Sequence, residues 1–358
     1  MSDNNGDLRH LDTLDRDLAR FSRLEMATQY AGRPMVGPAI SLLFIVLAGL
    51  AAALFFGQTN NSMIVIVATC LGAYMALNIG ANDVANNMGP AVGANALTMG
   101  GAIAIAVVFE SAGALIAGGD VVSTIAKGII APESMGDAST FVWAMMAALL
   151  SAALWVNLAT YVGAPVSTTH SVVGGVMGAG IAAAGFGAVS WDTMGAIAAS
   201  WVISPVLGGV IAAFFLFVIK SRIIYTDDKI AAARRWVPIL VGIMAGAFGA
   251  YLALKGLKKL IKIDMPTALM IGLGIAVLVW LVMIPVIKKQ SEGLENRNKS
   301  LKVLFGIPLV VSAALLSFAH GANDVANAVG PLAAIVQVSQ SGNFTDSFGI
   351  PFWVMVIG

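Results

Sequence analysis

Two short polar segments stand out from a mostly apolar sequence. GANDVANNMGP begins at Gly80 and GANDVANAVGP begins at Gly321, so nine of eleven residues recur 241 positions apart. Each copy carries one aspartate, Asp83 or Asp324, at the end of an apolar segment. A carboxylate inside a membrane is costly and is therefore a functional candidate by default. Oxygens of Asp and Asn suit a hard cation such as sodium better than a transition metal.

The cation ligands predicted from these copies are their adjacent Asn and Asp residues, namely Asn82, Asp83, Asn323 and Asp324. Glycine and proline flank both copies, and we expect them to break the helix and to free backbone carbonyls for the site. The expected breaks lie at Gly80, Gly89, Pro90, Gly321, Gly330 and Pro331. The alternative, in which the polar residues only cap a broken helix, is disfavoured because the same polar set occurs twice.

A third polar segment, GAPVSTTHSVVGG from Gly163, has the composition of an anion site. Pro165 interrupts the apolar sequence, and Ser167, Thr168 and Thr169 stand where a new helix is expected to begin. Free N–H groups and hydroxyls at a helix N-terminus bind anions. An anion held beside two carboxylates, with no Lys or Arg in either GANDVAN copy, needs an accompanying cation. The combination favours symport of a cation with an anion.

The composition requires a membrane to position these residues. Of 358 residues, 58% are hydrophobic and 11% are charged, whereas about a quarter of residues are charged in soluble domains. We therefore predict an all-α polytopic membrane protein. The net charge of +1 favours neither nucleic acid nor an acidic partner, and the single cysteine, Cys70, excludes an internal disulfide and a thiolate metal cluster.

Nine apolar segments have about the length needed to cross or enter a bilayer. They are residues 36–57, 63–79, 92–118, 141–162, 168–186, 194–219, 236–254, 265–287 and 303–319. The first is too long for a signal peptide and is predicted to be a retained extra helix. The polar tail before it, residues 1–35, has apolar residues at the spacing of an amphipathic helix, namely Leu11, Leu14, Leu18, Phe21 and Leu24.

Basic loops orient the chain. The loops from Lys220 and from Lys288 each carry five Lys or Arg residues and flank two apolar segments, so both are predicted to be cytoplasmic, together with the N-terminus. The lysine-containing loop from Lys255 is the one exception. In this orientation the two GANDVAN copies are inverted, which is typical of transporters with inverted-topology repeats. The predicted organisation is a first repeat at 63–219, the basic loops with two helices at 220–302, and the start of a second repeat at 303–358.

These motifs resemble the inorganic phosphate transporter (PiT) family. The resemblance rests on Gly80–Pro90, on FESAGALIAGGDVVSTIAKGI from Phe109, on Pro165–Gly175 and on Phe318–Ala334. It implies a helical inverted-repeat fold with broken or re-entrant helices and with phosphate held near the midplane. Family members usually carry a second Pro-Ser-Thr-Thr-His element, which is expected beyond Gly358, so the sequence is predicted to be part of a longer protein.

The resemblance also implies roles for individual residues. The phosphate ligands would be Asp83, Asn86, Ser167, Thr168, Thr169, Asp324 and Asn327, and further transport residues would be Glu110, His170 and His320. The prediction is a symporter of inorganic phosphate in the inner membrane, coupled to sodium or protons and working by alternating access. It is not an enzyme and has no cofactor beyond the co-transported ion. The predicted partners are phosphate and the lipid bilayer, without nucleic acid, and a homodimer is left open.

Other functions compete with this prediction. A sulfate permease is the runner-up, because hydroxyl and N–H donors also suit that tetrahedral dianion. An intramembrane hydrolase could use Ser167, His170 and Asp83, but no Gly-x-Ser-x-Gly elbow surrounds the serine. A zinc site at His170 and His320 would need more ligands at shorter spacing. An ion channel is disfavoured because an inverted repeat with an anion site favours alternating access.

Overall fold

A computed structural model describes residues 35–58, 61–119, 128–256, 263–341 and 351–358 of the chain. Among these residues, eight helices are long and apolar enough to cross a membrane. They are Met35–Phe56, α2 (Ser62–Gly93), α3 (Met99–Ala117), α5 (Ala138–Tyr161), α7 (Trp191–Ile219), α8 (Lys229–Lys255), α9 (Met265–Gln290) and α11 (Gly306–Ser341). The chain is a multi-pass helical membrane protein, which confirms the predicted class. The amphipathic helix predicted in the N-terminal tail lies outside the described residues.

Shorter elements connect and complete these helices. They are η2 (Pro132–Met135), α6 (Thr168–Ala184), η3 (Phe186–Ala188), the π-helical turn η4 (Lys220–Ile224), α10 (Asn298–Leu304) and α12 (Phe352–Ile357). α6 corresponds to the predicted segment 168–186, and with 17 residues it is shorter than the eight helices above. Gly163, with φ of 72°, and Pro165 form an open turn after α5, and α6 begins after this turn.

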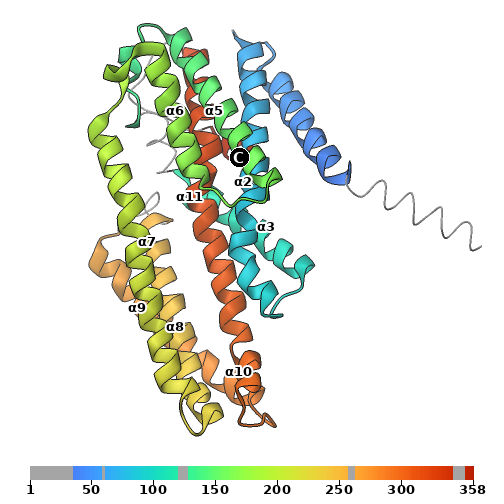
Figure 1. The fold of residues 1–358 in the computed structure, drawn as a ribbon, viewed down its shortest axis with the longest axis vertical. Coiled ribbons are helices and arrows are strands. Elements are labelled where there is room, and N and C mark those ends of the chain that lie inside the picture. Colours follow the sequence, from blue (N-terminus) through green and yellow to red (C-terminus); the bar gives the residue numbers. More distant parts are fainter. Residues whose placement is uncertain (1–34, 59–60, 120–127, 257–262, 342–350) are drawn as a thin grey trace, which may run out of the picture.

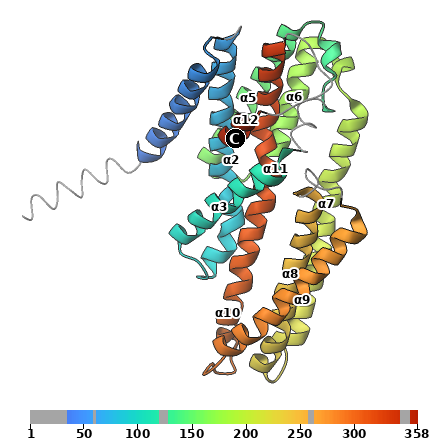
Figure 2. The same cartoon turned by 180° about the vertical axis from the view of Figure 1, so that it is seen from behind.

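The two helices that carry the GANDVAN copies, α2 and α11, pack side by side in opposite directions (Figures 1 and 2). Asn61, at the start of α2, donates from Nδ2 to the carbonyl of Ser339 near the end of α11, at 3.2 Å. Further along, a Cβ at Gly72 would lie 2.8 Å from the side chain of Leu332. The predicted inversion of the two copies is confirmed.

The predicted breaks in these helices are wrong. α2 is helical through Gly80, Gly89 and Pro90, and α11 is helical through Gly321, Gly330 and Pro331. A glycine keeps its N–H and costs only about 1 kcal/mol relative to alanine, while a proline removes one donor. An unpaired backbone group in hydrocarbon costs several kcal/mol, so the helix continues. The site contacts that the structure describes are accordingly made by side chains of continuous helices.

α5 and α6 form a hairpin whose tip packs against α11. Asp137 caps α5 by accepting the Thr140 N–H at 2.6 Å, and this hydrogen bond lowers the pKa of the Asp137 carboxyl. The chain turns after Tyr161 and re-enters a helix at Thr168, whose hydroxyl contacts Asp324. Since α11 extends from Gly306 to Ser341, the tip meets this helix near its middle. That geometry is typical of a re-entrant hairpin.

Two apolar clusters stabilise the two ends of the molecule. The larger cluster joins α2, α5, α6 and α11, and the second joins α8, α9 and α10. α8 and α9 pack closely because a Cβ at Gly246 would lie only 2.7 Å from the carbonyl oxygen of Gly272. α7 has no buried residue and connects the α5–α6 hairpin with the α8–α9 pair (Figure 1).

Candidate functional site

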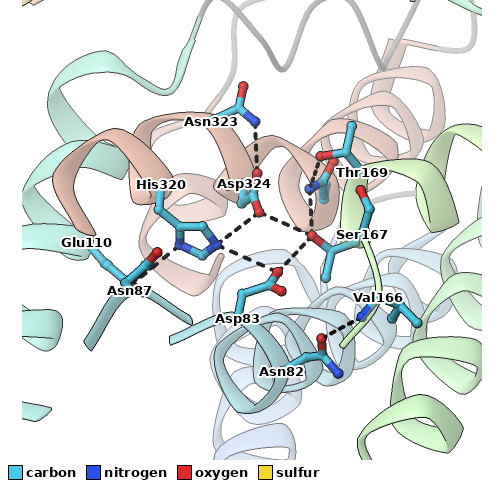
Figure 3. Close-up of polar contacts among 12 residues, drawn as sticks. Asn82, Asp83, Asn87, Glu110, Val166, Ser167, Thr169, His320, Asn323 and Asp324 are labelled. Atoms are coloured by element: carbon cyan, nitrogen blue, oxygen red, sulfur yellow. Dashed lines mark hydrogen bonds and ion pairs between the residues drawn. The ribbon is translucent and has the colours of Figure 1, made fainter. Parts of the chain in front are cut away.

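Asp83, Asp324 and His320 point toward one another in the site (Figure 3), and the Thr168 hydroxyl contacts both carboxylates. Its Oγ1 is 3.0 Å from Oδ2 of Asp83 and 3.2 Å from Oδ2 of Asp324. The two carboxylates come from α2 and α11, and the hydroxyl comes from the first turn of α6. A hydroxyl has a single hydrogen, so Thr168 donates to one carboxylate at a time. Because the Thr168 side chain is buried, its hydrogen bonds to these carboxylates are stronger than they would be in water.

Asn327 completes the buried side of this cluster. Its Nδ2 donates to Oγ1 of Thr169 at 3.1 Å and lies 3.3 Å from Oγ1 of Thr168. The residue is only 1% exposed, and its Oδ1 has no hydrogen-bond partner among the described residues. A buried carbonyl oxygen without a donor is costly unless a ligand satisfies it. This oxygen is a ready ligand for a cation bound beside the carboxylates.

His320 connects the carboxylates with a third acid. Its Nε2 lies 3.0 Å from Oδ2 of Asp324 and 3.6 Å from Oδ2 of Asp83, while its Nδ1 lies 3.5 Å from Oε1 of Glu110. Glu110 also accepts a hydrogen bond from Asn87 Nδ2 at 3.0 Å. Ligand atoms of Asp83, His320 and Asp324 all lie within 4.8 Å of one another, close enough to surround one cation.

A cavity of about 520 Å³ opens beside this cluster, between α2, α3, α11 and α12. Its polar wall includes Glu110, Ser111, His320 and Asp324, and the rest of its lining is mostly apolar. Ligand sites commonly combine a mostly apolar wall with a few polar groups in this way. The cavity gives a small ion access to the carboxylates and the imidazole.

Asn82 holds the tip of the α5–α6 hairpin. Its Nδ2 lies 2.9 Å from Oγ1 of Thr160 and 3.3 Å from the carbonyl of Ala164, and its Oδ1 accepts the Val166 N–H at 3.2 Å. Both ends of the amide therefore bind the tip, although the sequence predicted a cation ligand at this position. Asn82 fixes Thr168 next to Asp83 and acts on the site through this placement.

The remaining predicted residues lie at the edge of the site or outside it. Ser167 is exposed and caps α6 by accepting the His170 N–H at 3.2 Å. Asn323 is exposed and lies 2.9 Å from Oδ1 of Asp324 through its Nδ2. Asn86 is exposed, outside the hydrogen-bonded cluster that the structure describes, whereas Asn87, its neighbour, is buried and holds Glu110.

The placement of His170 argues against two alternatives. Its imidazole packs on Trp201 of α7, with ring centroids 3.9 Å apart, and is exposed. Ser167 therefore contacts the backbone of His170 and not its ring, so the predicted Ser-His pair of a hydrolase is not formed. His170 also lies outside the group of Asp83, His320 and Asp324 whose ligand atoms converge. A zinc site with both histidines has no support in this geometry.

Sequence reasoning missed Asn87 and Thr160. No simple periodicity marks Asn87 in the sequence, because spacings of four and five residues place Asn82 near Asn78 on the helix but put Asn87 on the side opposite Asn78. All three are buried in α2.

Comparisons with known proteins identify the family of the chain. A sequence model of the phosphate transporter family matches residues 79–358. A "Putative phosphate permease" of Helicobacter pylori strain J99 is 49% identical over 348 residues, covering 96% of this chain and 65% of the relative. A "Putative phosphate permease" of Pyrococcus abyssi is 36% identical over 288 residues, covering 80% of this chain and 70% of the relative. The chain thus spans about 65% of the length of its Helicobacter relatives.

A solved structure, "The sodium-dependent phosphate transporter", has 35% sequence identity and a TM-score of 0.77, and the similarity covers 82% of this chain and 72% of that one. The similarity of the two folds is consistent with the helical structure of this chain and with the opposite directions of α2 and α11. The family model and these relatives are described as phosphate transporters or permeases. The predicted family is confirmed, and the chain belongs to the phosphate transporter family.

Proposed function

We propose that the protein is a symporter that carries inorganic phosphate across the membrane together with a cation. One observation carries the proposal: two carboxylates on inverted helices, Asp83 and Asp324, meet at a hydroxyl on the tip of the α5–α6 hairpin. Two negative charges that share one hydroxyl hydrogen require a counter-charge before an anion can bind beside them. Family membership supports phosphate as that anion.

Sodium is the first candidate for the coupling ion. Carboxylate, hydroxyl and amide oxygens are hard ligands, and the Oδ1 of Asn327 is buried with no partner among the described residues. The transporter with the similar solved structure is described as sodium-dependent. In this mechanism sodium binds first at Asp83 and Asp324 and lowers the repulsion that these groups exert on phosphate. The anion then binds the hydroxyls and N–H groups at the start of α6, namely those of Ser167, Thr168 and Thr169.

The proton is the second candidate, and His320 is the reason. Its imidazole faces three acids, with Nε2 3.0 Å from Asp324 and 3.6 Å from Asp83, and with Nδ1 3.5 Å from Glu110. A proton delivered here would neutralise the same carboxylates that sodium would bind. Coupling to either ion therefore uses one cluster.

Exposure of the loaded site to each side in turn would follow from rocking of the inverted helices about it. We further place the chain in the inner membrane with its N-terminus and both basic loops in the cytoplasm. The loops from Lys220 and Lys288 lie at one end of the molecule (Figure 1). Two basic loops on the same side of the membrane are what the positive-inside rule requires.

The test is uptake of labelled phosphate by proteoliposomes that contain the full protein. An inward sodium gradient and an inward proton gradient are imposed separately, each with and without excess sulfate. We expect sodium to drive uptake that sulfate does not inhibit. Uptake driven only by protons would select His320 coupling, and inhibition by sulfate would move the substrate to the runner-up anion.

Variants connect this uptake with the site. Asp83→Asn and Asp324→Asn should each abolish gradient-driven uptake, because each removes one of the two charges that bind the cation. Asp192→Asn, at the exposed start of α7, is the matched control and should retain uptake. Gradient-driven uptake that survives in both site variants would contradict the proposal.

A further inference from the structure

The two basic loops predicted from the sequence form one packed platform. η4 and α10 both contact α8, and Ile223, Ile230 and Leu301 are buried in the same apolar cluster. Asn296 joins the loops directly, since its Oδ1 accepts the Lys229 N–H at 2.9 Å and its Nδ2 donates to the Asp227 carbonyl at 2.6 Å. The basic side chains are thus carried by one rigid surface at one end of the molecule.

This platform has a large excess of positive charge. Residues 220–236 and 288–302 contain ten basic side chains and four acidic ones. Some of the cations have partners: Arg297 pairs with Glu295 at 2.9 Å, and Arg234 donates to Ser291 Oγ at 2.6 Å. The Arg222 guanidinium lies 5.9 Å from the centroid of the Trp236 ring.

Among the described residues, Arg297 is the one cation of these ten with a carboxylate within 4.0 Å. In the part of the chain that the structure describes, Lys220, Arg235, Lys288 and Lys289 are exposed and have no carboxylate within 4.0 Å. Arg234 attaches the second turn of α8 to Ser291, two residues after Lys289. The free cations of α8 and α9 therefore lie at the same edge of the platform.

The apolar residues that precede these cations in α7 and α9 indicate what the cations face. Lys220 follows Phe214 and Phe217, which are exposed on the last turns of α7, and Lys288 follows Leu281 and Val282, which are exposed on α9. Acyl chains must cover such apolar side chains in a membrane. The cations that follow them are thereby held at the level of the lipid headgroups.

We propose that Lys220, Arg235, Lys288 and Lys289 form a binding surface for the headgroups of anionic phospholipids in the adjacent leaflet. A phospholipid satisfies both features, because its phosphate faces the free cations while its acyl chains cover the apolar ends of α7 and α9. A soluble acidic protein or free phosphate would satisfy only the charge. The inference is independent of the transport proposal, since it concerns a surface away from the Asp83–Asp324 site.

The test uses native mass spectrometry of the delipidated, detergent-solubilised full chain. Phosphatidylglycerol and phosphatidylcholine with identical acyl chains are titrated separately. We expect phosphatidylglycerol to bind in preference, and Lys288→Gln/Lys289→Gln to weaken its binding by roughly thirtyfold, given the usual contribution of each basic side chain near an anionic surface. Added salt should weaken the binding to the wild-type protein as well.

A charge-matched control is Lys255→Gln/Arg297→Gln, which also removes two positive charges. Lys255 ends α8 far along the helix from the platform, and Arg297 is already paired with Glu295. This variant should bind phosphatidylglycerol like the wild-type protein. Equal binding of the two lipids, unchanged binding by the Lys288→Gln/Lys289→Gln variant, or displacement of the lipid by inorganic phosphate at constant ionic strength would each overturn the proposal.

Discussion

At the scale of single residues, the site depends on which side chains the helices bring to the Thr168 hydroxyl. Asp83 and Asp324 lie where the repeated sequence motif suggested, but Asn82 does not face them as a ligand. Its amide binds the hairpin tip through Thr160, Ala164 and Val166. The same residue type in the second copy, Asn323, is exposed and contacts Asp324. Equivalent positions of the repeat thus make different contacts in this chain.

Asn82→Asp separates the positioning role of this residue from a ligand role. The substitution removes the two Nδ2 contacts and places a carboxylate oxygen against the Ala164 carbonyl. Losing such a buried hydrogen bond costs about 1–3 kcal/mol, so the phosphate concentration for half-maximal uptake should rise roughly tenfold or more. The sodium concentration for half-maximal uptake should stay unchanged.

Asn157→Asp is the matched control, because Asn157 is exposed and bonds Asn78 at 3.0 Å, outside the hairpin tip. It should leave both half-maximal concentrations near their wild-type values. A lower sodium requirement in Asn82→Asp would show that residue 82 binds the cation directly, as an added negative charge on a ligand would increase cation affinity.

At the scale of helices, glycine controls how closely α3 and α11 cross. A Cβ at Gly321 would overlap the backbone of Glu110, with the carbonyl carbon and Cα each 2.7 Å away. A Cβ at Gly113 would similarly overlap the Phe318 carbonyl. The crossing positions Glu110 beside His320, so the same glycines that pack the helices also place the third acid.

Gly321→Ala should destabilise the protein, and Gly80→Ala should not. The two glycines occupy the same position of the repeated motif, yet a Cβ at Gly80 has no atom within 4 Å among the described neighbours. Overpacking of a tight contact costs about 1–3 kcal/mol, whereas alanine within an exposed helix stabilises by up to about 1 kcal/mol over glycine. The apparent midpoint of thermal unfolding in detergent measures both variants, and equal midpoints would refute this account of the crossing.

The sequence predicted much of the fold but not the course of the helices through the motifs. Charge and segment counting predicted that α2 and α11 are inverted. This prediction was possible because basic loops and apolar segments are both defined by composition over long stretches. Whether α2 breaks at Gly80 depends on the energy of unpaired backbone groups in a particular neighbourhood, which sequence does not contain. The sequence also does not show that Asn87 is buried and Asn86 exposed, because this depends on the rotation of α2 against Glu110 of α3.

At the scale of the whole molecule, the loops at the two ends define its orientation. The turn between Met35–Phe56 and α2 lies at the opposite end from η4 and α10 (Figure 1). By the positive-inside rule, the excess of basic residues around η4 and α10 predicts that this end faces the cytoplasm. The domain boundaries predicted from the sequence, including the extent of each repeat, stay predictions.

Cysteine labelling tests this orientation. In a background with Cys70→Ala, which removes the single native cysteine, new cysteines are introduced at the exposed positions Gln58, Ser221 and Asn298. A membrane-impermeant maleimide should label Gln58→Cys in intact cells, and should label Ser221→Cys and Asn298→Cys only in inside-out vesicles. Labelling of positions 221 and 298 from opposite sides would contradict the common platform.

The wide separation of the site residues along the chain constrains how the protein is made. Thr168 lies 85 residues after Asp83, and Asp324 follows Thr168 by another 156. During synthesis Asp83 can gain its hydroxyl partner once the α5–α6 hairpin is inserted, but the second carboxylate reaches the hairpin only after α7, α8 and α9 have left the ribosome and entered the bilayer. α2, α5 and α6 therefore form an early assembly unit, and the docking of α11 is the late step that completes the site.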